Sequence, residues 1–431
     1  MTDRFEIHQD PVLGEQVLLA RTSSGLPVRV VPTDRFTEVA AVITFGYGST
    51  DLGFQRNGEE HRSPEGVAHY LEHKLFEDEE LQAFDRFAKR GARVNAMTGF
   101  GQTTYYFTAT DQLEANLQDL LHLVSNAHIT PDNVEKERGI IAQEIRMYED
   151  SPDYRGFFDF LGCLYREHPV RHPVGGTVES IAEITDEELL ACFDAFYRTG
   201  NAGMAVAGPV DPDQILDLAE ACTLREGAAP ERLSPRDLGP VTTPSFRRSF
   251  DVARSRVLLG YKDRSLLDTS EERLRRDLLS RILLDSLFGA SSDLRETLRL
   301  QGLVDDTLGA SYMSEADFGV TAVGCECEEP ETVIERLQDV MLDAASSPIQ
   351  VEHLDRVGRM VLGSYVRSFA SVKGMAFSHA KEALRGTRPF QSLVRMNSIT
   401  IDDLVSRRSE HFVEDAFAAV VVEKDASDPI R

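Results

Sequence analysis

The sequence contains a pattern that returns after half of the chain. Thr185 opens a helical stretch that is followed by a short apolar strand around Val206, and Thr400 opens a similar stretch that is followed by a strand around Val421. The members of each pair lie 215 positions apart in a chain of 431 residues. We therefore predict an internal duplication, with two α/β halves that are weakly similar in sequence.

A proline-rich stretch marks the join between the two halves. Thr223–Ser245 has few apolar residues and contains Pro230, Pro235, Pro240 and Pro244. Such a stretch is typical of a linker, and the chain is too long for a single core. The predicted domains are 1–222, 223–245 as the linker, and 246–431. The predicted fold class is α+β, an α/β sandwich in which each half has a mixed, largely antiparallel sheet covered by helices.

The first half opens with several short apolar stretches. Gln16–Ala20 and Leu26–Val31 are predicted to be strands, and the more continuous apolar run Glu38–Phe45 is predicted to be a central strand. Arg93–Met97 and Thr103–Ala109 are predicted to form a hairpin. These strands are expected to build the sheet of the first domain.

A helix that carries two histidines is predicted between these strands. Ser63, followed by Pro64 and Glu65, is a helix-start signal. Further along, His69, Glu72 and His73 lie on the face opposite an apolar stripe. Two imidazoles one turn apart can bind one metal ion, and the carboxylate between them reaches the water that such an ion would hold. The alternative is a solvated polar helix face.

A second predicted helix, Val134–Tyr148, offers a third ligand. Glu137 and Glu144 are seven residues apart, so they lie nearly in line on one face. Apolar residues bracket Glu144, and a carboxylate there is costly unless a cation or hydrogen bonds satisfy it. We assign Glu144 to the metal and Glu137 to a supporting position that orients a ligand histidine. The alternatives are a salt bridge from Glu144 to Arg138 or Arg146 and an ordinary charged surface around Glu137.

These motifs together resemble the pitrilysin/insulinase family of zinc peptidases, on the bacterial branch related to the mitochondrial processing peptidase. The family signature is His-x-x-Glu-His followed by Glu-x6-Glu, and the chain supplies His69-x-x-Glu72-His73 and Glu137-x6-Glu144. The stretches 91–98 and 168–177 also resemble sequence motifs that are usual in the family. The resemblance to the family is strong in the first half of the chain. In the second half it is limited to the general pattern of the sequence.

The resemblance implies a zinc-dependent endopeptidase that cleaves peptides or small unfolded polypeptides. One zinc ion per chain would be bound by His69, His73 and Glu144, and Glu72 would act as general base on the attacking water. In the family, the strand with the Asn-Ala motif lies at the sheet edge beside the metal, and substrate adds there as a further strand. Asn95, Ala96 and Met97 are therefore candidate substrate-binding residues.

The second half has no metal motif. Shifting the ligand positions by the same 215 residues leads to Leu284, Leu287 and Phe288, which are apolar. Family members that complete the active site carry an Arg and a Tyr seven residues apart in this half, and the expected positions here are Leu298 and Asp305. The resemblance therefore implies a heterodimer in which a homologous metal-free subunit supplies the Arg/Tyr pair and encloses the peptide; the alternative is a homodimer.

A different class of function also remains open, a non-catalytic zinc-binding scaffold or peptide-binding subunit of a larger assembly. The composition of the chain also indicates which classes of binding partner it is expected to have. The net charge of −26 argues against nucleic acid and anionic membranes as partners, and it suggests a preference for basic peptides. The first residues are not typical of a signal peptide, no apolar run is long enough for a membrane span, and the five cysteines are scattered. We therefore expect a cytoplasmic protein without a membrane partner.

Overall fold

The computed structural model describes residues 4–10, 13–77, 83–343, 349, 351–396 and 398–424. The chain forms two compact units, and neither is continuous in sequence. Unit 1 comprises Met1–Ile145, Pro173–Ser234 and Ser364–Gln391, and unit 2 comprises Arg146–His172, Pro235–Gly363 and Ser392–Arg431. The predicted ranges 1–222 and 246–431 do not coincide with these units, because each unit contains a segment from the other half of the chain.

Unit 1 is built on a seven-stranded sheet. In spatial order its strands are β1 (Glu6–Gln9), β2 (Gln16–Arg21), β3 (Pro27–Pro32), β9 (Ala202–Gly208), β4 (Val39–Phe45), β8 (Thr103–Ala109) and β7 (Arg93–Thr98). Only β3 and β9 pair in parallel, and the other pairs are antiparallel. Every residue of β4 and β9 is buried, as expected for central strands. A separate hairpin consists of β5 (Gly53–Arg56) and β6 (Glu59–Arg62).

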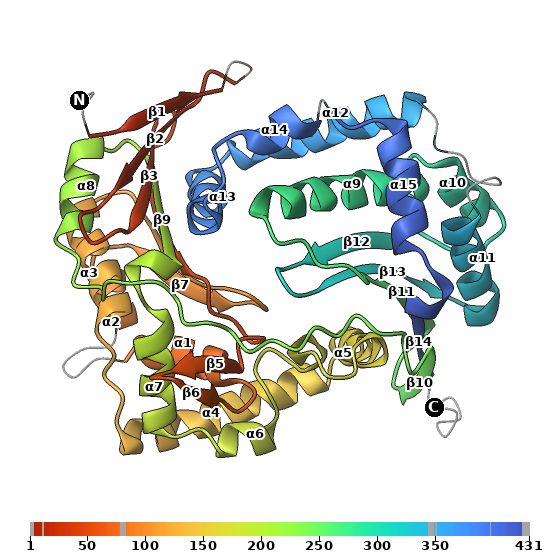
Figure 1. The fold of residues 1–431 in the computed structure, drawn as a ribbon, viewed down its shortest axis with the longest axis horizontal. Helices are drawn as coiled ribbons and strands as arrows, with labels where there is room; N and C mark the ends of the chain where they lie inside the picture. The colour runs from red at the N-terminus through yellow and green to blue at the C-terminus, as the bar shows by residue number, and fades with distance from the viewer. Residues whose placement is uncertain are drawn as a thin grey trace. The chain divides into compact units, whose positions relative to one another are not determined.

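The two faces of this sheet are covered by different helices. Alternate residues of β4 point to opposite faces, and Ala41 and Ile43 join the larger core, whereas Ala40 and Val42 join the smaller one. The smaller core includes α13 (Val372–Arg385), which packs on β9, β4 and β3 (Figure 1). The larger core contains residues from six helices of unit 1: α1 (Val67–Leu75), α2 (Ala83–Lys89), α3 (Leu113–Ser125), α4 (Pro131–Glu149), α7 (Asp186–Phe196) and α8 (Pro212–Glu220). The short helix α6 (Val178–Ala182) also contributes Ile181 to this core.

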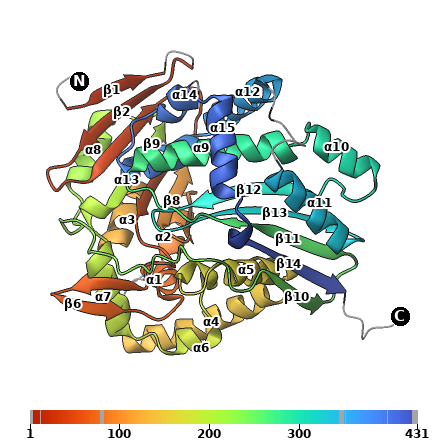
Figure 2. The same ribbon diagram turned by 45° about the vertical axis from the view of Figure 1, so that its right-hand side comes forward.

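Unit 2 is built on a five-stranded sheet. Its strands in spatial order are β10 (Ser245–Phe250), β14 (Phe417–Lys424), β11 (Ser255–Lys262), β13 (Gly319–Cys327) and β12 (Gly309–Ser314). Its core is filled by α9 (Ser270–Phe288), α10 (Asp293–Leu300), α11 (Pro330–Leu342) and α15 (Ile401–His411). In Figure 2, α5 (Pro152–Leu164) lies along β14 and β10, with which it is in contact. The remaining helices are α12 (Val351–Ser368) and α14 (Gln391–Met396).

The two sheets repeat one topology, which is the structural form of the predicted duplication. The order β3-β9-β4-β8-β7 in unit 1 corresponds strand by strand to β10-β14-β11-β13-β12 in unit 2. The parallel pair occupies the same place in both, since β3 pairs with β9 and β10 pairs with β14 in parallel. The predicted fold class, two mixed and largely antiparallel sheets covered by helices, is confirmed.

The two halves of the sequence exchange one helix each. The first half contributes α5 to the sheet of unit 2, and the second half contributes α13 to the sheet of unit 1. This exchange is the physical reason why the compact units differ from the contiguous ranges predicted from the linker.

The interior of unit 2 contains a buried charged cluster around Asp263. One oxygen of this carboxylate lies 2.8 Å from Nη1 of Arg407 and 2.7 Å from Nδ1 of His411. The other oxygen accepts a hydrogen bond from the hydroxyl of Tyr312, and it lies 3.6 Å from Nη1 of Arg276. The charged groups are at most 5% exposed, so protein groups rather than water stabilise the charge of Asp263.

Candidate metal centre

Helix α1 packs one side into the core of unit 1 and leaves its two histidines on the other. Val67, Leu71 and Leu75, the predicted apolar stripe, are at most 2% exposed. His69 and His73 are half-buried, and their ring centroids lie 4.7 Å apart. The spacing of one helical turn therefore places both imidazoles on the same side of the helix, as predicted.

The start of α1 differs from the prediction. The helix begins at Val67 rather than directly after Ser63, and its N-cap is Gly66 in the left-handed conformation, with φ of 88°. A glycine adopts this conformation without the strain that a Cβ would cause. The Ser63 hydroxyl does not cap the helix and instead lies 3.3 Å from the sulfur of Cys192.

A glycine-rich loop fixes the approach to α1. A Cβ on Gly66 would lie 2.4 Å from the carbonyl oxygen of Gly175, so only glycine allows the two backbones to come this close. Gly176 has φ of 73°, and the Ser180 hydroxyl donates a hydrogen bond of 2.9 Å to the carbonyl of Glu65. The 168–177 stretch singled out in the sequence thus ends in a loop that supports the histidine helix.

Helix α4 brings the two predicted carboxylates to the histidines. Glu144 lies 3.7 Å from Nε2 of His69 through Oε1 and 3.4 Å from Nε2 of His73 through Oε2. Glu137 Oε1 lies 3.0 Å from Nδ1 of His73. Arg138, one of the two alternative partners of Glu144, donates to the backbone carbonyls of Ala182 and Ile184.

The carboxylates around the two histidines favour an added positive charge at the site. Burial lowers the pKa of His69, and the neighbouring His73 lowers it further. Burial also lowers the pKa of His73, but hydrogen bonds with Glu137 and Glu144 outweigh this and raise it to about 9. The hydrogen bond with His73 in turn lowers the pKa of Glu137. Without a metal ion, a proton on His73 therefore balances part of the carboxylate charge.

The donor set fits a zinc ion. One ligand atom each from His69, His73 and Glu144 lie within 4.8 Å of one another. Two imidazole nitrogens and a carboxylate oxygen are ligands that zinc takes in catalytic sites, where three protein ligands leave one position open. Nε2 of His69 is the ring nitrogen that faces Glu144. The other ring nitrogen, Nδ1, is buried and has no hydrogen-bond partner among the described residues.

Glu72 lies beside this cluster and is held by a residue that the sequence reasoning missed. The hydroxyl of Thr98, the last residue of β7, donates a hydrogen bond of 2.5 Å to Oε2 of Glu72. Burial raises the pKa of Glu72, while the hydrogen bond from Thr98 and the charge of His73 oppose the rise. The sequence feature that could have indicated a role for Thr98 is its position at the end of the hairpin strand, next to Gly99.

The candidate substrate residues lie on an edge strand. Among the described residues, β7 pairs with β8 alone and forms one edge of the seven-stranded sheet. Asn95 and Met97 are exposed, whereas Ala96 packs against the core on the same face as Thr98. The side chain of Asn95 accepts a hydrogen bond from the Ala96 N–H.

The corresponding positions of unit 2 carry no such chemistry. Leu284, Leu287 and Phe288 are at most 5% exposed and belong to the core. Leu298 is also buried there, and Asp305 forms an ion pair of 2.6 Å with Arg254. These side chains therefore pack or form an ion pair within unit 2.

Comparison with known proteins identifies the family. The model described as "Insulinase (Peptidase family M16)" matches residues 57–178, and "Peptidase M16 inactive domain" matches residues 183–360. The chain is 33% identical to the uncharacterized zinc protease YmfH of Bacillus subtilis (strain 168), over 94% of this chain and 95% of that protein. The chain belongs to peptidase family M16, the insulinase family, as the resemblance implied.

Solved structures agree with this assignment. A putative M16-like peptidase from Alicyclobacillus acidocaldarius is 33% identical, with a TM-score of 0.91 over 99% of this chain and all of that one. A peptidase M16 inactive domain from Pseudomonas fluorescens, 16% identical, has a TM-score of 0.79 over 96% of this chain and 99% of that one, and it shares the fold. In the described part of the chain, no helix is both long and apolar enough to cross a membrane.

Proposed function

We propose that the chain is a zinc-dependent endopeptidase that cleaves peptides or small unfolded polypeptides. The observation that carries this proposal is the convergence of His69, His73 and Glu144 from two helices, with Glu72 held beside them. The names of relatives in the family as zinc proteases support the same conclusion.

The three converging residues would bind the ion, one per chain, and Glu137 would orient His73 through its Nδ1. When bound, zinc supplies Lewis-acid chemistry, which polarises a carbonyl oxygen and makes water more acidic. Glu72 takes the proton of the attacking water and transfers it to the leaving amine. Burial keeps the pKa of Glu72 above its usual range, which suits a group that must both accept and return a proton near neutral pH.

The edge strand β7 supports a mode of substrate binding. An extended peptide can add to a sheet edge through main-chain hydrogen bonds, with little dependence on its sequence. β7 ends at Thr98, whose hydroxyl is bonded to Glu72, so a peptide alongside Asn95, Ala96 and Met97 would run toward the general base. This binding mode suits unfolded polypeptides rather than folded proteins.

A second subunit completes the proposed enzyme. Leu298 and Asp305 stand where an Arg/Tyr pair is expected, and neither can act as that pair. We expect a homologous metal-free subunit to supply the pair and to enclose the peptide, with a homodimer as the alternative. Mass and composition of the natively purified complex distinguish the two, and ordinary peptidase activity of the isolated chain would contradict the heterodimer.

The experiment that tests the function compares three forms of the native complex on a set of fluorescent peptides. The wild type should cleave, and removal of zinc by a chelator should abolish cleavage until zinc is returned. Glu72→Gln should lower kcat by about 10²–10⁴-fold, the usual contribution of an acid–base group, while zinc content stays the same. Glu135→Gln, at a side chain 75% exposed on α4, is the matched control and should keep full activity.

The outcome also separates the proposal from its alternative. A non-catalytic scaffold would bind zinc and peptides through the same residues, but it would show no chelator-sensitive cleavage. Equal activity of Glu72→Gln and the wild type would contradict the assigned role of Glu72.

A further inference from the structure

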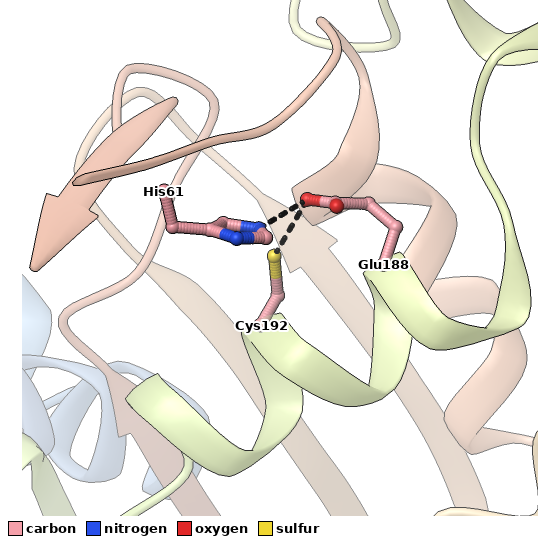
Figure 3. A group of neighbouring side chains, drawn as sticks. All are labelled: His61, Glu188 and Cys192. Carbon is pink, nitrogen blue, oxygen red and sulfur yellow. Dashed lines mark hydrogen bonds and ion pairs between the residues drawn. The ribbon is translucent and has the colours of Figure 1, made fainter. Parts of the chain in front are cut away.

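A second cluster of metal-binding side chains lies in unit 1, outside the candidate metal centre. Its members are His61 on β6 and Glu188 and Cys192 on α7, and one ligand atom of each lies within 4.8 Å of the others. Figure 3 shows the three side chains directed at one another, with dashed lines that join one carboxylate oxygen of Glu188 to the imidazole and to the sulfur.

The distances in this cluster are close to those that a zinc ion would impose. His61 Nε2 lies 2.9 Å from Oε1 of Glu188, and the same oxygen lies 3.7 Å from the sulfur of Cys192. Zinc bonds of about 2.0–2.3 Å to N, O and S in a tetrahedral arrangement separate the ligand atoms by roughly 3.3–3.6 Å. Small side-chain movements therefore convert the hydrogen-bonded cluster into a coordination site.

The backbone places the ligands in a pattern like that of the candidate metal centre. Glu188 and Cys192 are four residues apart on α7, as His69 and His73 are on α1, and a helix presents such a pair on one face. The third ligand, His61, comes from a separate strand. Both clusters thus combine a pair one turn apart on a helix with one residue from elsewhere in the chain.

Two of the three side chains in the cluster are partly exposed to solvent, which can supply a fourth ligand. Cys192 is buried, whereas the side chains of His61 and Glu188 are 22% and 16% exposed, so water reaches the imidazole and the carboxylate. Three protein ligands and one water complete a tetrahedral zinc site. The sulfur and imidazole ligands select zinc over magnesium and calcium, which prefer oxygen alone.

We propose that His61, Glu188 and Cys192 form a second zinc site. On binding, the Cys192 thiol becomes a thiolate and its proton passes to solvent. The ion links the β5–β6 hairpin, which pairs with no other named strand in the described part of the chain, to α7. Because β6 leads directly into the segment before α1, the second zinc fixes the chain eight residues ahead of His69.

The test counts metal in the purified full-length chain. The wild type should bind two zinc ions, and a His69→Ala/His73→Ala variant should keep one. In that variant, cobalt(II) should give a sulfur-to-metal charge-transfer absorption in the near ultraviolet. The candidate metal centre has no sulfur ligand, so this band reports on the second site alone.

Substitutions then locate the site. In the same background, Cys192→Ser and, separately, His61→Gln should abolish the remaining stoichiometric zinc, and Cys192→Ser should remove the cobalt band. Cys222→Ser, at another cysteine of unit 1, is the matched control and should leave the metal count and the band unchanged. Circular dichroism checks that each variant is folded. His61→Gln, at a half-buried side chain on a mostly exposed strand, serves if Cys192→Ser does not fold.

Three results would overturn the proposal. The first is a His69→Ala/His73→Ala variant that binds no stoichiometric zinc. The second is a cobalt complex without the sulfur band. The third is a band that survives Cys192→Ser, which would assign the sulfur to another cysteine such as Cys325 or Cys327.

Discussion

The two units contain polar clusters that are balanced in opposite ways. In unit 1 three carboxylates, those of Glu72, Glu137 and Glu144, lie around two histidines. In unit 2 one carboxylate, that of Asp263, is surrounded by two arginines and a histidine, and a tyrosine donates a hydrogen bond to it. The first cluster has an excess of negative charge, and the second has its carboxylate fully compensated by protein groups.

This difference separates a binding site from a structural cluster built on the same topology. Burial alone would raise the pKa of Asp263, but His411 at 2.7 Å and Arg407 at 2.8 Å lower it well below the usual range. The cluster of unit 1 instead draws a proton onto His73, and an added cation would replace that proton. Substitutions should therefore change stability in unit 2 and metal affinity in unit 1.

The largest expected effect is on the stability of unit 2. Asp263→Asn removes the carboxylate and leaves Arg407 buried without its counter-charge, which should lower the free energy of unfolding by about 3–5 kcal/mol. Urea denaturation measures this loss. Asp153→Asn, at a side chain 79% exposed, is the control and should change stability by less than about 0.5 kcal/mol. Equal effects of the two substitutions would contradict the structural role of Asp263.

Glu144→Gln should weaken metal binding strongly and change stability little, which is the reverse of Asp263→Asn. It removes a charged ligand, so zinc affinity should fall by more than the ~10–100-fold that is typical of supporting residues. In the metal-free protein it removes one of the two carboxylates that pair with protonated His73, but Glu137 keeps its contact, so stability should fall only slightly. Competition with a zinc-binding dye measures the affinity, and urea denaturation of the metal-free chain measures the stability. A large loss of metal-free stability would place Glu144 in the same class as Asp263.

Glu137→Gln should have an intermediate effect on the metal. Glu137 is bonded to Nδ1 of His73, and the loss of such a supporting carboxylate lowers metal affinity by about 10–100-fold. The same dye competition applies, with Glu135→Gln as the control on α4. If zinc affinity is unchanged, Glu137 serves packing between α1 and α4 rather than the orientation of His73.

The smallest expected effect is a pH dependence that belongs to unit 2. Burial lowers the pKa of His411, so the unfolded chain takes up this proton first when pH falls. Its contribution to stability is complete above about pH 6.5 and is lost as pH falls toward the lowered pKa of the folded state. The urea midpoint should therefore drop between pH 6.5 and pH 5, and the drop should be smaller in His411→Asn. An equal drop in both proteins would assign the pH dependence to other groups.

The sequence was sufficient to predict which side chains of α1 and α4 come together, because helical periodicity encodes which residues share a face. The one-turn spacing of His69 and His73 and the seven-residue spacing of Glu137 and Glu144 fix which side chains share a face. The contact between Thr98 and Glu72 joins a strand to a helix, and no periodicity records it. The same holds for His61 and Cys192, which are far apart in sequence.

The fold was predictable to the level of the duplication but not to the level of the helix exchange. The 215-residue repeat gave two similar halves, and the topology of the two sheets agrees strand by strand. An amphipathic pattern shows that a helix has an apolar face, but it does not show which sheet that face covers. The sequence of α5 or α13 therefore does not show that each helix covers the sheet of the opposite half.

The position of α13 affects how the protein is made. The ribosome synthesises the strands of unit 1 long before it reaches Val372, so the sheet face with Val31, Val42 and Ala205 stays uncovered until nearly the whole chain has emerged. An apolar surface of this kind is a site where nascent polypeptides associate wrongly, and a chaperone would have to protect it. Truncated chains that end at the linker should therefore aggregate during expression rather than yield a separate zinc-binding domain.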